Sequence, residues 1–251
     1  MTRLHRSWTF PYLDYFRGSR ALLVAAHSIE SGKAYEFSVG PDRFAAICTR
    51  YPMYPQVDVD VALCIVDQEV RGIAFENVAI DRTWASVGSN VLLTGYGNAQ
   101  PQAPNDGVFR IGNAAIVGER GFEFVARGGA AAGFGDSGGG GYIVRDGGRA
   151  INGVISKGNI SNTTYLTRLS ADLTLRFLES WSAKYSMPIC GLDAAAKNRH
   201  PSVGATPTTF RLENSVALVQ VQLKPAFVAS PDAIRTGVEK ALLSFAALSE
   251  E

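Results

Sequence analysis

The chain has 251 residues, of which 24 are basic and 23 acidic, so its formal net charge is +1. This balance favours neither nucleic acid nor an anionic membrane as a partner. The longest apolar stretches, such as 21–26 and 91–93, fall far below the roughly 20 residues of a membrane-spanning helix. The length suits one two-layer or two-barrel body with a small addition.

The first apolar run of the chain ends at a histidine. Residues 21–26 read Ala-Leu-Leu-Val-Ala-Ala, which is typical of a strand buried on both faces, and His27 follows directly. A lone histidine at a strand end is ordinarily a core side chain bonded to a backbone carbonyl, and this interpretation stays open beside a functional one. His5 and His200 lie in polar, irregular sequence that predicts solvated side chains.

Two aspartates open the next long apolar segment. Residues 35–39 and 43–49 predict two strands, and 57–66 predicts a third, in which Asp58 and Asp60 alternate with valines. A carboxylate at the edge of so apolar a strand is costly unless a cation or a hydrogen-bond donor meets it. His27 is the candidate partner of either aspartate, unless both only line a solvated face.

The second half predicts further short strands and one helix. Residues 91–97, 108–111, 114–117 and 122–125 are apolar runs bounded by glycine or asparagine. The first helical period appears at 171–185, where the apolar residues of one face are Leu173, Phe177, Leu178 and Trp181. This order predicts an all-β architecture with a late helix.

A glycine-rich turn at 133–141 contains Ser137. Glycine reaches positive φ without steric cost and lets a ligand approach the main chain closely. The apolar runs 142–144 and 151–156, with Asp146-Gly147-Gly148 between them, predict a hairpin directly after the turn. We therefore interpret the turn as part of a sheet rather than as a flexible linker. Its neighbouring N–H groups are suited to converge on one point beside the serine.

Three segments together resemble the trypsin-like (chymotrypsin-fold) serine proteases. They are Ala25-Ala26-His27, Asp60-Val61-Ala62-Leu63 and Gly135-Asp136-Ser137-Gly138-Gly139, in the order His, Asp, Ser of that family. The likeness covers about residues 15–186 of the chain. It implies Ser137 as nucleophile, His27 as general base and Asp60 as the carboxylate that orients His27. Asp58 is the alternative for the role of this carboxylate. It also implies the Gly135 and Ser137 amides as an oxyanion hole, and neither metal nor cofactor.

The resemblance also implies an architecture. It predicts two six-stranded antiparallel barrels: residues 1–88, carrying His and Asp, and residues 89–186, carrying Ser and a closing helix. Residues 187–251 lie outside the resemblance and predict a linker, a strand near 216–223 and a helix to 248 with one apolar face. We expect this face to dock on the barrels or on an activating or regulatory protein.

Five positions are expected to bind substrate by the same resemblance. Ala131, six residues before the nucleophile, forms the uncharged floor of the pocket for the side chain that precedes the cut. Ser156, Lys157 and Gly158 belong to the strand that pairs with the substrate backbone, and Thr163 narrows the pocket wall. Together they predict a protein substrate cut after a small or medium apolar residue.

Asp136 raises a question about regulation. In secreted members of the family, the equivalent aspartate is neutralised by a new amino terminus released by cleavage, and this chain has no Ile-Val-Gly-Gly-like start. A buried carboxylate without a partner is costly. Either a nearby arginine meets Asp136, or the turn stays malformed until a partner protein binds, and the second case predicts activation by that protein.

The cysteines bear on the compartment. Cys48, Cys64 and Cys190 are odd in number and lie among apolar neighbours, as buried thiols do. Ser28 stands where many secreted members of the family carry a disulfide cysteine, and residues 1–8 lack the pattern of a secretory signal. These observations predict a reducing, cytoplasmic setting.

The leading prediction is an intracellular serine endopeptidase that cuts a particular protein, in a bacterial signalling or defence pathway. An esterase that uses the same groups is disfavoured, because that class usually has the order Ser, Asp, His on an α/β fold. A protease-like scaffold that binds without catalysis is the alternative.

Overall fold

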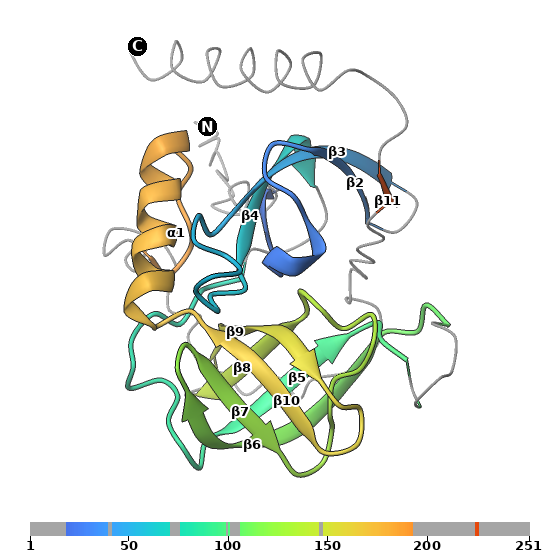
Figure 1. The fold of residues 1–251 in the computed structure, drawn as a ribbon, viewed down its shortest axis with the longest axis vertical. Helices are drawn as coiled ribbons and strands as arrows, with labels where there is room; N and C mark the ends of the chain where they lie inside the picture. Colours follow the sequence, from blue (N-terminus) through green and yellow to red (C-terminus); the bar gives the residue numbers. More distant parts are fainter. Residues whose placement is uncertain are drawn as a thin grey trace, which may run out of the picture.

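The computed structural model describes residues 19–39, 42–70, 76–98, 100, 106–145, 148–192 and 224–225. These residues form a mostly β architecture: a closed six-stranded barrel, a second sheet and one α-helix (Figure 1). The sheet lies above the barrel in this view, and the helix stands beside the sheet.

The N-terminal half folds into an antiparallel five-stranded sheet in the order β1–β4–β3–β2–β11. The strands are β1 (Ser19–Val24), β2 (Ala34–Val39), β3 (Asp42–Arg50), β4 (Ala62–Val70) and β11 (Lys224–Pro225). The apolar run at 21–26 supplies most of β1, and the strands expected at 35–39 and 43–49 are β2 and β3. Within the described residues this half is a five-stranded sheet, where the resemblance predicts a barrel of six strands.

The C-terminal half closes into a six-stranded barrel, as predicted, in the order β10–β7–β6–β5–β8–β9. Its strands are β5 (Asn90–Gly95), β6 (Arg110–Arg120), β7 (Glu123–Arg127), β8 (Gly140–Arg145), β9 (Gly148–Gly158) and β10 (Thr163–Arg168). The hairpin expected after the glycine-rich turn is β8 and β9. The separate strands expected at 108–111 and 114–117 are wrong, because Gly112 and Asn113 between them stay paired with Leu93 and Leu92 in one continuous β6.

Helix α1 (Asp172–Tyr185) follows the barrel in sequence but packs against the other half. Its buried side chains include the predicted Phe177, Leu178 and Trp181, which share one core cluster with Tyr51 and Leu63. The rings of Phe177 and Tyr51 meet edge to face, with 5.9 Å between centroids. The helix therefore joins the two halves, whereas the resemblance led us to expect a helix that closes the second barrel. Within the described ranges, no helix has the length and apolar character needed to span a bilayer.

The tail of the chain meets the N-terminal sheet in the short strand β11. Lys224 and Pro225 pair antiparallel with Glu36 and Tyr35 of β2. The strand expected at 216–223 and the helix expected up to 248 lie outside the described residues, as do His5 and His200. The domain boundaries at residues 88 and 186 stay predictions. In the structure, β4 ends at Val70, and the barrel strands run from Asn90 to Arg168.

Two of the three cysteines form a disulfide. Cys48 of β3 and Cys64 of β4 are directly opposite each other, with 3.9 Å between their Cα atoms, and both are fully buried. The prediction of separate buried thiols is wrong for this pair, because the strand register brings together residues that lie 16 apart in sequence. Cys190 is a free thiol whose pKa is raised by burial. Since disulfides are typical of oxidising compartments, the cysteines no longer support a reducing setting.

We predict that protein purified without reductant and denatured in guanidinium chloride contains one thiol that reacts with Ellman's reagent, because two of its three cysteines are paired. Reduction in the denaturant, followed by removal of the reductant, provides the control and should raise the number to three. Three reactive thiols before reduction would contradict the disulfide.

Candidate active site

His27 lies at the point where the N-terminal sheet ends against the barrel. It sits in a 3-10 helix (Ala26–Ser28) just beyond β1, and Ala25 and Ala26 before it are fully buried. These small anchors fix the backbone while the imidazole remains partly exposed, with 36% of its side chain accessible. The histidine is thus positioned by the core while its ring stays partly accessible to solvent.

Asp60 is held beside His27 by two hydrogen bonds. The His27 backbone N–H donates to Asp60 Oδ1 at 2.8 Å, and Asp60 Oδ2 lies 2.6 Å from His27 Nδ1. The predicted strand at 57–66 is shorter than expected, since β4 begins only at Ala62 and leaves the aspartates in an irregular segment. Asp58 instead pairs with Lys157, 2.9 Å away. Of the two candidates, Asp60 is therefore the one in contact with the histidine.

Ser156 completes the surroundings of this carboxylate from the barrel side. Its hydroxyl donates to Asp60 Oδ2 at 2.6 Å across 96 residues of sequence, and both side chains are buried. Burial by itself would raise the pKa of Asp60, but the hydrogen bonds from His27 and Ser156 outweigh it and lower that pKa below its usual value. Sequence reasoning assigned Ser156 only to substrate binding, because no local pattern marks a contact between the two halves.

Ser137 lies in the turn between β7 and β8, close to the segment that carries His27. A Cβ built on its neighbour Gly138 would lie 3.3 Å from the backbone nitrogen of Ala25 and 3.6 Å from Cα of Val24. Gly138 also has a φ of +87°, which favours glycine at this point, so the serine turn lies directly against the end of β1. Ser137 and His27 are both described, and no hydrogen bond joins their side chains in this structure. The sequence-predicted residues are therefore gathered on adjoining segments, with the contact between Asp60 and His27 formed.

The four residues 133–136 form a turn with a defined peptide orientation. The Asp136 N–H donates to the Gly133 carbonyl at 3.2 Å, and Gly135 has a φ of +92°. A positive φ confined to the third residue is characteristic of a type II turn, in which the central peptide is turned over relative to type I. That peptide carries the Gly135 N–H. Among the described residues, the backbone N–H groups of Gly135 and Ser137 have no hydrogen-bond partner, so both remain available to a ligand oxygen.

Asp136 is held by main-chain amides. Its carboxylate accepts from the N–H of Gly97 at 2.7 Å and from the N–H of Gly133 at 2.8 Å. A Cβ at Gly95 or Gly97 would overlap the carboxylate, which explains glycine at both positions. Arg110 donates to the Gly97 carbonyl at 3.0 Å, and its pKa is raised, mainly by its hydrogen bond to Asp106 and in smaller part by the charge of Asp136. Amides and a nearby arginine thus compensate this carboxylate without a new amino terminus.

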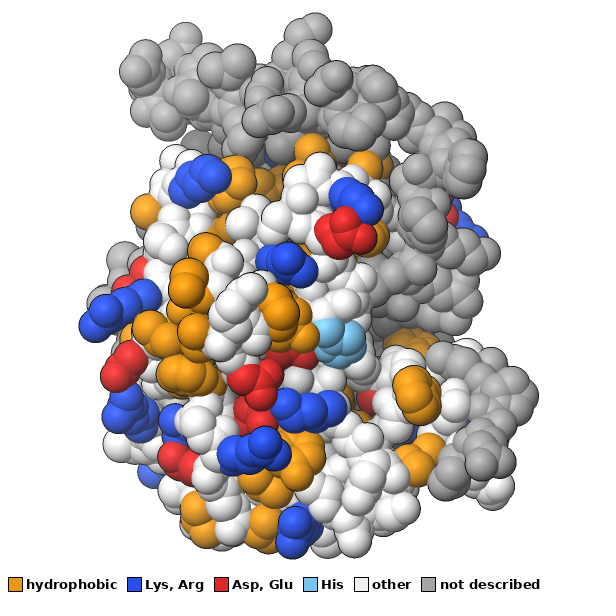
Figure 2. Space-filling model, viewed as in Figure 1, with side chains coloured by type: hydrophobic (Ala, Val, Ile, Leu, Met, Phe, Trp, Pro, Cys, Tyr) orange, Lys and Arg blue, Asp and Glu red, His pale blue; other side chains and the backbone are white. Residues whose placement is uncertain are grey.

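Lys157 has its charge engaged by two carboxylates. Its ammonium group lies 2.9 Å from Asp58 and 2.8 Å from Glu123, and Glu123 is buried. Burial raises the pKa of Glu123, an effect that the lysine opposes. Figure 2 shows this face of the molecule, where acidic and basic side chains gather beside a histidine. The pair with Asp58 joins the barrel to the segment that leads into β4.

The remaining predicted substrate positions lie on neighbouring segments. Ala131 precedes buried Ala132, whose N–H donates to Thr164 Oγ1 at 2.7 Å. Gly158 ends β9, and Thr163 begins β10 as a buried residue. The structure thus brings together the segments that contain all five predicted positions.

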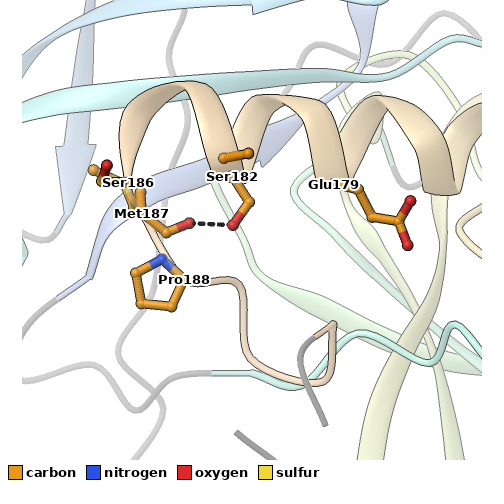
Figure 3. Close-up of a pocket in the computed structure, with 6 residues that line it drawn as sticks. Glu179, Ser182, Ser186, Met187 and Pro188 are labelled. Atoms are coloured by element: carbon orange, nitrogen blue, oxygen red, sulfur yellow. Dashed lines mark hydrogen bonds between the residues drawn. The ribbon is translucent and has the colours of Figure 1, made fainter. Parts of the chain in front are cut away.

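Features elsewhere in the described residues do not suggest a second centre. No three His, Cys, Asp or Glu side chains among them gather in a way that could hold a metal ion. A hollow of about 370 Å³ lies along the C-terminal end of α1, lined by Glu179, Ser182, Ala183, Ser186, Met187 and Pro188 (Figure 3). The Ser182 hydroxyl there donates to the Met187 carbonyl at 2.7 Å. None of the predicted site residues lines this hollow.

Comparison with known proteins yields a structural neighbour. Neither protein-family models nor curated protein sequences give a match. A solved structure of a mutant of human heparin binding protein (CAP37) is similar, with a TM-score of 0.52 and 14% identity, over 72% of this chain and 94% of that one. That protein is a chymotrypsin-fold protease homologue. The fold is chymotrypsin-like. At 14% identity the likeness shows the fold alone and carries no information on activity.

We predict that Ser156→Ala lowers the unfolding free energy by about 1–3 kcal/mol at pH 7, because Asp60 loses a buried donor. The lowered pKa of Asp60 stabilises the fold above the ordinary aspartate pKa of about 3.9, and this contribution is lost as pH falls through the folded pKa. The difference between wild type and variant should therefore shrink on acidification. Urea unfolding at several pH values measures it. Ser180→Ala, whose hydroxyl donates to the Phe177 carbonyl, should show no such pH dependence.

We predict that Gly97→Ala destabilises the protein by about 1–3 kcal/mol, because its Cβ would displace the Asp136 carboxylate from the amides that satisfy it. Gly118→Ala is the matched control, since a Cβ at Gly118 meets no atom within 4 Å. Denaturant unfolding of both variants tests the prediction. Equal stabilities would mean that Asp136 can move without cost.

Proposed function

We propose that this protein is a trypsin-like serine endopeptidase in which His27, Asp60 and Ser137 act together on a peptide bond of a specific protein substrate. The observation that carries the proposal is the buried Asp60 carboxylate, which accepts hydrogen bonds from the histidine of one half and Ser156 of the other. A chymotrypsin-like fold with the glycine-rich serine turn beside β1 supports the same assignment.

Asp60 sets the protonation state of the histidine. A carboxylate can only accept hydrogen bonds, so the 2.6 Å contact places a proton on His27 Nδ1 and leaves Nε2 as the basic nitrogen. Nε2 then removes the Ser137 hydroxyl proton as the oxygen attacks the substrate carbonyl carbon. The imidazolium that forms is stabilised by Asp60, which does not itself take up the proton.

The glycine-rich turn supplies the second part of the mechanism. Attack converts the carbonyl oxygen into an oxyanion, which the N–H groups of Gly135 and Ser137 bind. The tetrahedral intermediate collapses as His27 gives its proton to the leaving amine, and the C–N bond breaks. Water then attacks the acyl-serine with His27 again as base. His27 returns the proton to the Ser137 oxygen as the bond to the acyl group breaks, and the product acid is released. Each oxyanion donor is worth about 2.7–4 kcal/mol in comparable sites.

Several finer features belong to this proposal. Ala131 is the uncharged floor of a pocket that selects a small or medium apolar residue before the cut, with Ser156, Lys157, Gly158 and Thr163 around it. The N-terminal half completes a second barrel, and a partner protein docks on the 187–251 segment to regulate activity. The cytoplasmic location and the bacterial pathway stay predictions from the sequence. For the location, the Cys48–Cys64 disulfide is a counterargument.

We predict that a fluorophosphonate probe labels the wild-type protein on Ser137 and does not label Ser137→Ala. The serine oxygen displaces fluoride from the phosphorus atom of the probe only when a base activates the serine hydroxyl. Intact-protein mass spectrometry detects the adduct, and peptide mapping locates it. Ser161→Ala, at an exposed serine in the nearby 159–162 loop, is the control and should label like wild type. Absence of labelling in the wild type favours the alternative of a binding scaffold.

The same assay separates the two aspartates. Asp60→Asn should slow labelling by about 10⁴-fold, the loss expected when the histidine is held in the wrong tautomer. Asp58→Asn removes only an exposed ion pair with Lys157 and should slow it less than about tenfold. The reverse order would transfer the role of acid to Asp58.

A further inference from the structure

The space that would receive the substrate side chain lies between two walls that touch each other. One wall is 131–133, which leads into the serine turn, and the other is 158–160, at the end of β9. We call the space between them the side-chain slot. The Ile160 N–H donates to the Ala132 carbonyl at 2.8 Å, directly from wall to wall. A Cβ built on Gly158 would lie 2.8 Å from the Ala132 carbonyl carbon and 3.0 Å from its Cβ. At this level the Ala132 carbonyl and methyl groups lie directly against Gly158 and leave no room for a further carbon atom.

Ile160 closes the slot further toward the serine turn. A Cβ at Gly133 would lie 2.8 Å from Ile160 Cδ1 and 3.1 Å from its Cγ1, so this side chain packs directly on the Gly133 backbone. Gly133 is also the first residue of the turn that presents the Gly135 N–H. Ile160 has a φ of +57°, a strained conformation that is rare for a β-branched residue. The surrounding contacts must therefore hold it there.

Asn159 supplies those contacts. Its side-chain oxygen accepts from the backbone N–H groups of Ser161 at 3.1 Å, Asn162 at 2.9 Å and Thr163 at 2.9 Å. Its own N–H donates to the Thr163 carbonyl at 3.1 Å. An asparagine that caps three successive amides makes a compact, rigid loop. Ile160 is thus fixed over Gly133 by the loop that carries it.

We propose that Ile160 and the closed slot restrict the residue before the scissile bond to glycine or alanine. This inference rests on the proposed function and narrows it, because the uncharged Ala131 floor alone would admit medium-sized apolar side chains. A larger side chain would have to separate two segments joined by the Ile160–Ala132 hydrogen bond and by packing on Gly133. Overpacking of this kind is destabilising even in a deformable core. A hydrogen atom or a single methyl group avoids it.

The test uses p-nitrophenyl esters of acetylglycine, acetylalanine, acetylleucine and acetylphenylalanine, which probe this position without further subsites. For the wild type we expect kcat/KM for the glycine and alanine esters to exceed that for the leucine and phenylalanine esters by about 100-fold, the scale of discrimination by pocket size. Ile160→Gly suits the positive φ and removes the packing on Gly133. It should raise the ratio of leucine to glycine ester hydrolysis at least about tenfold.

Two further variants provide controls. Val117→Gly removes an exposed β-branched side chain from β6, outside both walls, and should leave the ratio unchanged. Ile160→Ala shortens the same side chain and should raise the ratio in the same direction, should Ile160→Gly fail to fold. Thermal unfolding establishes that each variant is folded before its kinetics are compared.

The outcomes distinguish this inference from the proposed function. Equal hydrolysis of all four esters by the wild type overturns the closed slot and leaves the peptidase intact. An unchanged ratio in folded Ile160 variants overturns the role of Ile160. Labelling of Ser137 by the fluorophosphonate without hydrolysis of the glycine ester also contradicts the slot. Failure of both labelling and hydrolysis removes the proposed function, and this inference with it.

Discussion

The buried Asp60 carboxylate is the interaction on which the site depends. It has an exposed fraction of only 2%, and burying a charge is unfavourable unless hydrogen bonds replace its hydration. Two of its partners come from His27 after β1, and the third is Ser156 on β9 of the barrel. Because no single half supplies all the donors, the carboxylate is satisfied only when the halves are docked. Helix α1 strengthens the same contact by packing residues of the C-terminal half on Tyr51 and Leu63.

A second carboxylate organises the serine turn by the same principle. Asp136 accepts hydrogen bonds from Gly133 at the start of the turn and from Gly97 beyond β5. The turn between Gly133 and Asp136 is thereby closed on itself and tied to Gly97, with the peptide of Gly135 in the orientation that a positive φ requires. Backbone amides here bind the Asp136 carboxylate in place of a charged amino terminus. The ordered conformation of the turn therefore comes from the barrel half itself. The geometry of the turn is therefore held by hydrogen bonds among the described residues of the chain.

Local sequence determined much of the fold, whereas contacts distant in sequence could not be read from it. Apolar runs bounded by glycine predicted the barrel strands, and the spacing of Phe177, Leu178 and Trp181 predicted the face of α1. The position of β4 was missed, because alternation at 57–61 resembles a strand while Asp60 is in fact bound to the His27 backbone. The Ser156–Asp60 bond, the Cys48–Cys64 pair and the helix docking all depend on how distant segments are brought together, and no short pattern encodes that.

The arrangement of polar groups also bears on the choice between an enzyme and a binding scaffold. A buried ion or ion pair is often no more stabilising than apolar residues of similar size, so stability gives no reason to retain Asp60 with its donors. The same holds for glycines at 95 and 97, which leave room for a carboxylate at a cost in backbone entropy. The proposed peptidase mechanism uses these groups together, because it needs an oriented imidazole and two unoccupied amides beside Ser137.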